Sequence, residues 1–556
     1  MVIHRSEETT GIGQNIDRYL SAMESIGFSG AIIVSHQGRV VLKKGYGLAD
    51  RESRRPYSAE TVQSLGSLAK QITGAAILLL ENQGKLSVDD SISLYFKDIP
   101  EEKQSITIHQ LLTHSSGLPG GIGPDDEPIG KQAFMERLMA EPLQFDPGSG
   151  YSYSNAGYSV LGMIIEQVSG LGYEEFLRTR LFLPAGMKDT GYILPGWNPK
   201  QLAEGYRKGE LWGRVYQRGW MEKGPGWHLR ANGGLHTTVD DMQQWLNTIR
   251  GHGVLPPETT RRWTTGYVRE GDSDSRYGYG WVDHNTEWGR MVSHSGSNRI
   301  FTADLFWLPG HDLIFYIHSN NYMFPAYRER GPLLRAALDP DFQMPPLVKP
   351  FAGALPEESG EKAGKYRLKG GSVELTSDDT RLVAKLYGQP TLDLFLKHTE
   401  EQKRRFAGLN KHVESTLERL EKGQEDALAG IAGEHQDPVE ATRILLDRIA
   451  QIGNLQTLHL IGTFENAPDS PLAGLGPMTT FVYAEFRNWN QYWNMVWNED
   501  GTYRGTYSGP WPSFFLIPTA KGKYKGVRPG PPWETVNLHF EGDCLVIGQQ
   551  RACRGN

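Results

Sequence analysis

Two residues that could do chemistry together, Ser67 and Lys70, lie three positions apart at the start of a helix predicted from about Leu68 to Asn82. Three residues make nearly one helical turn, so both side chains would share one face. A lysine whose pKa is lowered by burial can take the proton of a neighbouring serine, which makes that serine a nucleophile. The plain alternative is a helix cap beside a surface lysine, and residues 359–362 carry the same spacing.

A second candidate pair, Tyr153 and Asn155, lies in a loop before a helix predicted from about Ala156 to Val168. A phenol near a lysine can relay protons if its pKa of about 10 is lowered. The amide of Asn155 could hold a substrate carbonyl. The alternative is a turn tyrosine that only packs its ring, and residues 492–494 repeat the pattern.

A third candidate group, His294, Ser295 and Gly296, begins a late strand region. A glycine at a strand edge lets a substrate backbone approach closely. The N–H of the next residue, Ser297, could complete an oxyanion hole with the N–H of Ser67. The alternative is a structural histidine. We also expect a structural, hydrogen-bonded role for His114, in a loop that ends a helix.

The elements around these groups indicate how they could meet. Residues 12–26 show helical periodicity, and a hairpin follows at residues 30–44. A second hairpin is predicted within residues 300–318, near the other end of the same region. The simplest packing is one antiparallel sheet assembled from both ends, with a mostly helical lobe between them. The cleft between sheet and lobe is then the expected site.

The three groups, in this order, resemble the class C β-lactamase and penicillin-binding serine hydrolase family over about residues 12–335. Four further segments carry the same resemblance: residues 111–119 (LLTHSSGLP), 153–162 (YSNAGYSVLG), 233–238 (GGLHTT) and 277–281 (YGYGW). The resemblance implies an α/β (α+β) chain with a β-lactamase/transpeptidase-like fold. It also implies an acyl-enzyme on Ser67, with Lys70 and Tyr153 sharing the general acid and base work. Which of these two takes the first proton stays open.

The resemblance also assigns the other residues already named. It implies substrate contacts and an oxyanion hole: Asn155, His294, Ser295 and Gly296 for the substrate, and the N–H groups of Ser67 and Ser297 for the oxyanion. The β-lactamases usually carry lysine where this chain has His294, and a neutral histidine attracts a β-lactam carboxylate less well. The histidine resembles the esterase and D-aminopeptidase branch, which favours small esters or D-amino-acid amides and peptides as substrates. A D,D-peptidase or β-lactamase is the alternative, and a non-catalytic penicillin-sensor-like protein is the alternative of another class.

The chain continues well beyond the region of the resemblance. We expect a catalytic domain over residues 1–340, a Pro-rich linker over 341–360, a short β-rich segment over 361–398 and an α+β accessory domain over 399–556. The last part, with helices predicted at 401–422 and 438–452 before alternating strands, resembles an NTF2-like domain.

Composition restricts partners. The formal net charge is −7, so nothing global attracts nucleic acid. The longest apolar run near the N-terminus, Ala75 to Leu80, is far shorter than the roughly 20 residues of a membrane span. No HExxH pattern or CxxC pair is present, and we expect neither a metal nor a cofactor. Oligomeric state stays open.

Two features leave the compartment undecided. The N-terminus, MVIHRSEETTG, lacks the apolar stretch of a signal peptide. Either the protein stays in the cytoplasm, or it is exported and its signal has been removed. The two cysteines, Cys544 and Cys553, could be free thiols or could form a bridge, and their spacing permits both.

Overall fold

The computed structural model of the protein describes residues 2–207, 210–251, 253–349, 351, 360–378, 381–434, 436–466, 475–487, 490–508, 512–528 and 533–555. The chain divides into two compact units, Met1–Phe342 and Gln343–Asn556. None of the helices in the described part combines the length and the apolar character needed to cross a membrane.

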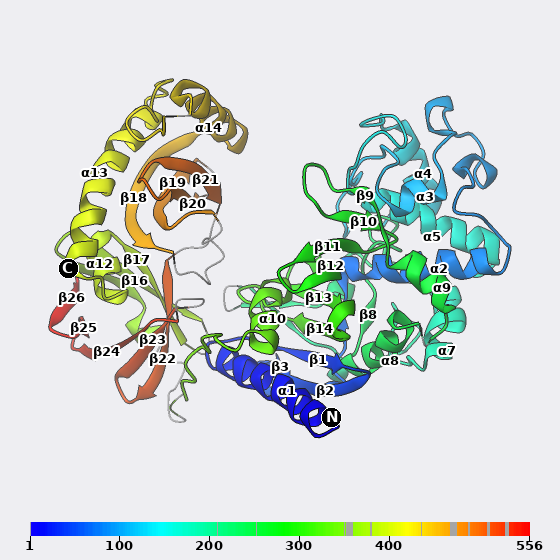
Figure 1. Ribbon diagram of the computed structural model, residues 1–556, viewed down its shortest axis with the longest axis horizontal. Coiled ribbons are helices and arrows are strands. Elements are labelled where there is room, and N and C mark those ends of the chain that lie inside the picture. Colours follow the sequence, from blue (N-terminus) through cyan, green and yellow to red (C-terminus); the bar gives the residue numbers. More distant parts are fainter. Residues whose placement is uncertain are drawn as a thin grey trace. The chain divides into compact units, whose positions relative to one another are not determined.

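The first unit is organised around one antiparallel sheet of eight strands in the order β2-β1-β14-β13-β12-β11-β10-β9 (Figure 1). The strands are β1 (Gly30–His36), β2 (Arg39–Tyr46), β9 (Gly266–Arg269), β10 (Arg276–Gly278), β11 (Val282–Thr286), β12 (Gly289–Asn298), β13 (Phe301–Leu308) and β14 (Leu313–Ser319). The two ends of the unit meet where β1 pairs with β14, with Gly30 opposite Ser319 and His36 opposite Leu313. This confirms the predicted fold, a sheet assembled from both ends.

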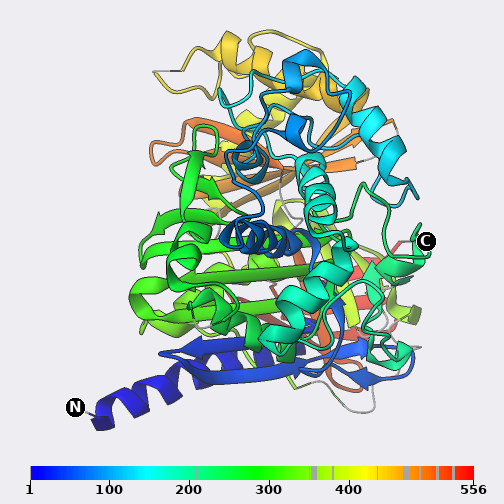
Figure 2. The same cartoon turned by 90° about the vertical axis from the view of Figure 1, so that its right-hand side faces the viewer.

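Helices cover this sheet, and α2 lies across one of its faces (Figure 2). The helices are α1 (Val2–Ser25), α2 (Ala69–Asn82), α3 (Ile108–Leu112), α4 (Lys131–Ala140), α5 (Asn155–Ser169), α6 (Tyr173–Leu177), α7 (Leu183–Ala185), α8 (Val239–Ile249), α9 (Pro257–Trp263) and α10 (Arg330–Leu338). Three short strand pairs complete the unit: β3 (Leu48–Asp50) with β4 (Arg55–Pro56), β5 (Gln63–Ser64) with β8 (His236–Thr237), and β6 (Gly205–Arg207) with β7 (Glu210–Gly213). Helix α1 begins at Val2 rather than at residue 12, because its polar first turns carry no apolar periodicity to reveal them.

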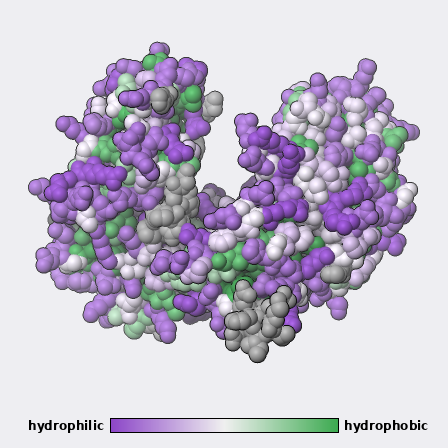
Figure 3. All heavy atoms as spheres, viewed as in Figure 1, coloured by the Kyte–Doolittle hydropathy of each residue, from purple (hydrophilic) through white to green (hydrophobic). Residues whose placement is uncertain are grey.

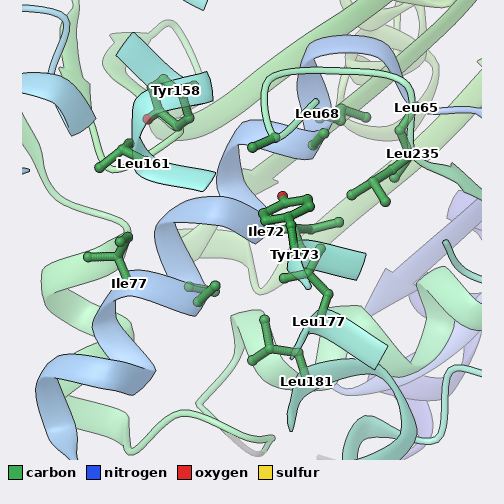
Figure 4. Packing of buried hydrophobic residues seen from close by; sticks show 14 of the residues in the cluster. Leu65, Leu68, Ile72, Ile77, Tyr158, Leu161, Tyr173, Leu177, Leu181 and Leu235 are labelled. Atoms are coloured by element: carbon green, nitrogen blue, oxygen red, sulfur yellow. The ribbon is translucent and has the colours of Figure 1, made fainter. Parts of the chain in front are cut away.

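The core of this unit fixes the start of α2. Ser67 lies in a 3-10 turn, Gly66–Leu68, that leads directly into the helix. Its neighbours Leu65 and Leu68 are fully buried, and Figure 4 shows both among the packed side chains around Ile72. Ser67 itself is only half-buried. Two apolar anchors therefore hold the turn in place while the hydroxyl between them stays accessible.

The second unit contains a closed barrel in the order β15-β16-β17-β22-β23-β24-β25-β26. Its strands are β15 (Gly364–Leu368), β16 (Gly371–Asp378), β17 (Arg381–Tyr387), β22 (Ser513–Ala520), β23 (Lys523–Val527), β24 (Thr535–Glu541), β25 (Cys544–Ile547) and β26 (Gln550–Arg554). The sequence separated residues 361–398 from 399–556, whereas this barrel takes strands from both. Closure explains the difference: β15 pairs with β26 and β17 with β22, which removes the free edges that an isolated short segment would expose.

Between β17 and β22 the chain forms a helical and sheet region. Its helices are α12 (Gln389–Phe395), α13 (Glu400–Glu421) and α14 (Pro438–Ile452). Its four-stranded antiparallel sheet runs β18 (Leu455–Glu465), β19 (Met478–Phe486), β20 (Asn490–Trp497) and β21 (Tyr503–Ser508). The two long helices lie within one residue of the ranges that the sequence predicts. The expected likeness of this region to an NTF2-like domain stays a prediction.

The two cysteines, which the sequence left open, form a disulfide between neighbouring barrel strands, where Cys544 lies opposite Cys553 in the register of β25 and β26. Part of the predicted Pro-rich linker, residue 350 and residues 352–359, lies outside the described residues. Figure 3 shows one face of the molecule, on which hydrophilic side chains predominate over both units.

Candidate active site

Ser67 and Lys70 are in hydrogen-bonding contact. The ammonium nitrogen Nζ of Lys70 lies 3.1 Å from Oγ of Ser67 and 2.8 Å from the backbone carbonyl oxygen of Asn232. Lys70 is fully buried. It also lies over the rings of Tyr153 and Tyr158, at 4.8 and 5.6 Å from their centroids. The sharing of one helical face that the sequence predicts is therefore present.

Lys70 is an unusual buried lysine because no carboxylate among the described residues forms an ion pair with it. Burial disfavours the charged ammonium and lowers the pKa of Lys70 to about 7, while the more distant carboxylate of Asp125 acts weakly in the opposite direction. A substantial fraction of this amine is consequently neutral near neutral pH. A neutral amine keeps a lone pair, so it can accept a proton as well as donate to the carbonyl of Asn232.

Tyr153 reaches the same point from the loop before α5. Burial raises its pKa, and hydrogen bonds with the side chains of Ser67 and Tyr277 offset only part of that rise. Its phenol therefore stays protonated over the whole neutral range, opposite to the behaviour of Lys70.

His114 holds that loop. Its Nδ1 accepts a hydrogen bond from the backbone N–H of Ser154 at 3.0 Å, and its carbonyl accepts one from Ser152 at 2.9 Å. Its ring packs against the ring of Tyr153 with a centroid distance of 4.2 Å. Burial places its pKa well below the usual value, so the ring is neutral. The hydrogen bonds of His114 hold the backbone on both sides of Tyr153 in place, which fits the structural role expected from the sequence.

Two glycines allow strand β12 to reach the turn that carries Ser67. A Cβ atom built on Gly66 would lie 2.4 Å from the backbone nitrogen of Ser297, and one on Gly296 would lie 1.9 Å from the carbonyl oxygen of Leu65. Gly66 also has a φ of +55°, a conformation that side chains disfavour. The backbone nitrogen of Ser297 thus lies beside the turn of Ser67, as an oxyanion hole built from these two N–H groups requires.

His294 lies on the same strand and is buried. Its Nδ1 lies 2.7 Å from the carbonyl oxygen of Ser295, so this nitrogen must donate. Its Nε2, 2.9 Å from the hydroxyl of Tyr277, is then the acceptor in a neutral ring. Burial first, and the charge of Lys70 second, lower the pKa of His294 to about 3. The histidine is therefore neutral, not partly charged as its ordinary pKa suggests.

A cavity of about 420 Å³ opens beside these groups. Six of the residues predicted from the sequence line this cavity: Ser67, Tyr153, His294, Ser295, Gly296 and Ser297. Lys70 lies beneath Ser67. Asn155 does not line the cavity, and its buried Oδ1 has no hydrogen-bond partner in the part of the chain that the structure describes.

The sequence did not single out several other residues of the site. The cavity is also lined by Glu270, Tyr277, Tyr327 and Arg330, and the carbonyl of Asn232 contacts Lys70. Tyr277 belongs to a segment that carried the family resemblance, and Asn232 directly precedes another. Asn232 acts through its backbone carbonyl, which leaves no signature in a pattern of side chains. Glu270 and Arg330 show no local motif at all. Among the described residues, no group of three His, Cys, Asp or Glu side chains could hold a metal ion.

The family model described as Beta-lactamase matches residues 18–339, more than half of the chain. This protein belongs to the beta-lactamase family of serine hydrolases. Penicillin-binding protein 4* of Bacillus subtilis (strain 168) is 27% identical over 476 residues, which cover 77% of this chain and 99% of that protein. Protein flp of Staphylococcus aureus (strain MW2) is 28% identical over 290 residues, which cover 49% of this chain and 55% of that protein.

Two solved structures share the fold of this beta-lactamase family member. The octameric penicillin-binding protein homologue from Pyrococcus abyssi superposes with a TM-score of 0.53 at 19% identity, covering 98% of this chain and all of that chain. The beta-lactamase/D-alanine carboxypeptidase from Yersinia pestis gives a TM-score of 0.51 at 20% identity, covering 59% of this chain and 97% of that chain. At these identities the likeness concerns the fold alone.

Proposed function

We propose that this protein is a hydrolase that forms an acyl-enzyme on Ser67 and cleaves small carboxylic esters or D-amino-acid amides and peptides. One observation carries the proposal. The amine of Lys70, fully buried and with its pKa lowered to about 7, lies 3.1 Å from the hydroxyl of Ser67. A surface lysine beside a helix cap, the plain alternative, would be solvated and charged.

Lys70 is the group that takes the first proton in this proposal. Near neutral pH its amine can be free, whereas the raised pKa of Tyr153 keeps the phenol protonated. The proton of Ser67 moves to Nζ of Lys70 as Oγ forms a bond with the substrate carbonyl carbon. The N–H groups of Ser67 and Ser297 then stabilise the negative oxygen of the tetrahedral intermediate.

Tyr153 supplies the proton for the leaving group. Its hydroxyl donates as the scissile bond breaks, and the protonated Lys70 returns a proton to the phenolate, so the two groups titrate as a coupled pair. Water then attacks the acyl-enzyme by the reverse route and gives a proton to the same pair. The pair returns a proton to Oγ of Ser67 as the bond between Oγ and the acyl carbon breaks, and the acid is released. The substrate contact that the sequence predicts for Asn155 stays a prediction, since Asn155 does not line the cavity.

The neutral state of His294 supports the ranking of substrates. A ring whose pKa is lowered to about 3 adds no positive charge that would attract a β-lactam carboxylate. A D,D-peptidase or β-lactamase is the second candidate, and the name of the Bacillus subtilis relative, a penicillin-binding protein, favours it. A non-catalytic penicillin-sensor-like protein is the third, although such a role leaves the contact of Lys70 with Ser67 without a purpose.

A substrate panel on the wild type and Ser67→Ala tests the proposal. The panel contains p-nitrophenyl esters of short acids, D-amino-acid anilides and a chromogenic cephalosporin. We expect turnover of the short esters that Ser67→Ala abolishes, and weak or no cephalosporin turnover. The exposed Ser53→Ala is the matched control and should behave as the wild type.

Mass spectrometry of the protein treated with a fluorophosphonate should place the adduct on Ser67. An adduct on another residue, or ester turnover that survives Ser67→Ala, contradicts the mechanism. Efficient cephalosporin turnover would reverse the ranking of substrates and favour the second candidate. Binding of penicillin with no turnover of any substrate would favour the third.

A further inference from the structure

We propose that Glu270 binds an ammonium group of the substrate, so that the preferred substrates carry a free amine close to the scissile carbonyl. This inference rests on the proposed function and narrows its substrate class. It concerns a carboxylate that no motif marked and that takes no part in the proton transfers proposed for Ser67.

Glu270 directly follows strand β9 and lines the same cavity as Ser67 and Tyr277. Two neutral donors hold its carboxylate. The hydroxyl of Tyr151 donates to Oε1 at 2.7 Å, and the hydroxyl of Ser275 donates to Oε2 at 2.6 Å. These bonds fix the orientation of the carboxylate and leave its negative charge in place.

No positively charged side chain in the described part of the chain forms an ion pair with Glu270. Asp304, the partner of the cavity-lining Arg330, differs in this respect. The carboxylate of Asp304 is fully buried and accepts hydrogen bonds from Nε of Arg330 at 2.9 Å and from Nη2 of Arg330 at 2.6 Å. The charges of this ion pair therefore cancel. His294 is neutral. Glu270 is thus the cavity-lining charge that lacks a counter-ion within the described residues.

A half-buried carboxylate in a cavity attracts a cation and repels an anion more strongly than the same group does in open water. Each carboxylate oxygen has a second acceptor position besides the one that its hydroxyl donor occupies. An ammonium group has three donors and can use both oxygens.

The size of the site limits where that amine can be in the substrate. Ser67 and Glu270 both line one cavity of about 420 Å³. A substrate that fills it can therefore place an amine at Glu270 only if the amine is a few bonds from the carbonyl under attack. A free α-amino group of a D-amino-acid ester or amide fulfils this condition, and an N-acylated one loses the charge.

The experiment compares D-alanine methyl ester with N-acetyl-D-alanine methyl ester near pH 7, with p-nitrophenyl acetate as a reference that lacks an amine. The wild type should prefer the ester with the free amine. Glu270→Gln keeps the size of the side chain and removes its charge. We expect it to lower the ratio of kcat/KM for the free amine over the N-acetyl ester at least tenfold, mainly through KM.

Glu287→Gln is the matched control, because Glu287 is exposed in the turn between β11 and β12 and does not line the cavity. It should leave the ratio as in the wild type. An equal loss for both esters in Glu270→Gln would show that Glu270 only holds Tyr151 and Ser275, and would overturn the inference. So would a wild type that prefers the N-acetyl ester.

A binding measurement separates this inference from the proposed function. If the wild type hydrolyses none of the three esters, the proposed function fails, and calorimetry with D-alaninamide then decides the ammonium site. Binding to Ser67→Ala protein that disappears in the Ser67→Ala, Glu270→Gln double variant supports the inference. Absence of binding, or binding that is the same in both proteins, overturns it.

Discussion

Each unit has a cluster of buried polar side chains, and the two clusters satisfy their hydrogen bonds to different degrees. In the second unit, the hydroxyl of Thr463 donates to Asn410 at 2.6 Å and lies 2.6 Å from the hydroxyl of Thr480. The indole N–H of Trp497 donates to the same hydroxyl of Thr480 at 2.9 Å. All four residues are buried and neutral, and each satisfies another. Such a closed network stabilises the packing of sheet and helix.

The first unit leaves its buried polar groups around Ser67 less satisfied. Within the described residues, the fully buried Lys70 has no counter-ion, and buried atoms of His114 and Asn155 have no hydrogen-bond partner. Burying such unsatisfied groups costs free energy, and a network that only stabilises the fold would avoid that cost. The difference indicates that the first unit sacrifices stability where shifted pKa values and open hydrogen-bond positions serve chemistry.

Replacing Lys70 should give the largest effect and should move activity and stability in opposite directions. Lys70→Met removes the proposed base, so kcat for p-nitrophenyl acetate should fall by about three orders of magnitude or more. The same change fills the site with an apolar chain and removes the cost of burying the amine. We expect the free energy of unfolding near pH 7 to rise by roughly 1–4 kcal/mol, because a pKa difference of one is worth about 1.4 kcal/mol and one hydrogen bond to Asn232 is lost.

The pH dependence of that stability difference supplies the control. The pKa of Lys70 is about 7 in the folded protein and about 10.4 in the unfolded chain, which therefore binds more protons between these values. The stability of the wild type should rise with pH in this window, and its disadvantage relative to Lys70→Met should narrow toward pH 10. Chemical denaturation at several pH values measures this difference in the free energy of unfolding. A Lys70→Met protein that is less stable at every pH contradicts a buried amine that destabilises the fold.

The activity of the wild type should itself depend on pH through Lys70. The amine accepts the proton of Ser67 only when neutral, so kcat/KM for p-nitrophenyl acetate should fall about tenfold for each pH unit below 7. From pH 7 to pH 5 this amounts to roughly a hundredfold loss. Neither His294 nor Tyr153 should add a limb between pH 5 and 9, because their pKa values lie outside that range. Circular dichroism over the same range shows whether the fold persists.

A flat profile between pH 5 and 8 would contradict Lys70 as the base. A rise with an apparent pKa near 9 or 10 would show that burial lowers the pKa of the Lys70 amine less than the structure indicates.

Tyr277→Phe should have a smaller effect, because Tyr277 supports His294 and Tyr153 through hydrogen bonds and exchanges no proton in the proposed mechanism. The change removes the hydroxyl that donates to Nε2 of His294 and leaves that atom without its partner. We expect kcat for p-nitrophenyl acetate to fall about tenfold with little change in KM, as when a supporting residue is removed. Tyr279→Phe is the matched control, since the hydroxyl of Tyr279 contacts Nδ1 of His109 and does not line the cavity. Equal losses in both variants would indicate a packing effect and no special role for Tyr277.

The contrast between the units also explains what the sequence could predict of the fold. Pairs of strands close in sequence have local turn signals, and the pairing of β1 with β14 followed from two hairpins at the ends of one region. The barrel was missed because β17 pairs with β22 across more than 120 intervening residues, and no local pattern encodes that contact. The predicted length of helix α1 was too short for a related reason, because its first turns have no apolar face that periodicity could detect.

The residues of the site differ in the same way in how far local sequence reveals them. Ser67, Lys70 and Tyr153 were found because their types and spacing recur as motifs, and a family resemblance joined them. Glu270 was missed because a single glutamate has no spacing to recognise, and only the cavity shows what it faces. The pKa of Lys70 could not be predicted either, because it depends on burial and on the absence of an ion pair, which three-dimensional packing decides.

The smallest effect on activity should come from the network of the second unit. Thr480→Val keeps the shape of the side chain and leaves the indole N–H of Trp497 and the hydroxyl of Thr463 without their shared partner. An unsatisfied buried group costs about 1–3 kcal/mol, so the melting midpoint of this unit should fall by roughly 2–8 °C in calorimetry. Thr519→Val, at an exposed strand position of the same unit, is the control and should change it little.

Because the network contains no group of the proposed mechanism, kcat for p-nitrophenyl acetate should stay within about twofold of the wild type at temperatures where the protein is folded. A large loss of kcat in Thr480→Val would show that the second unit contributes to the chemistry, and the contrast between a stabilising network and a reactive one would no longer hold.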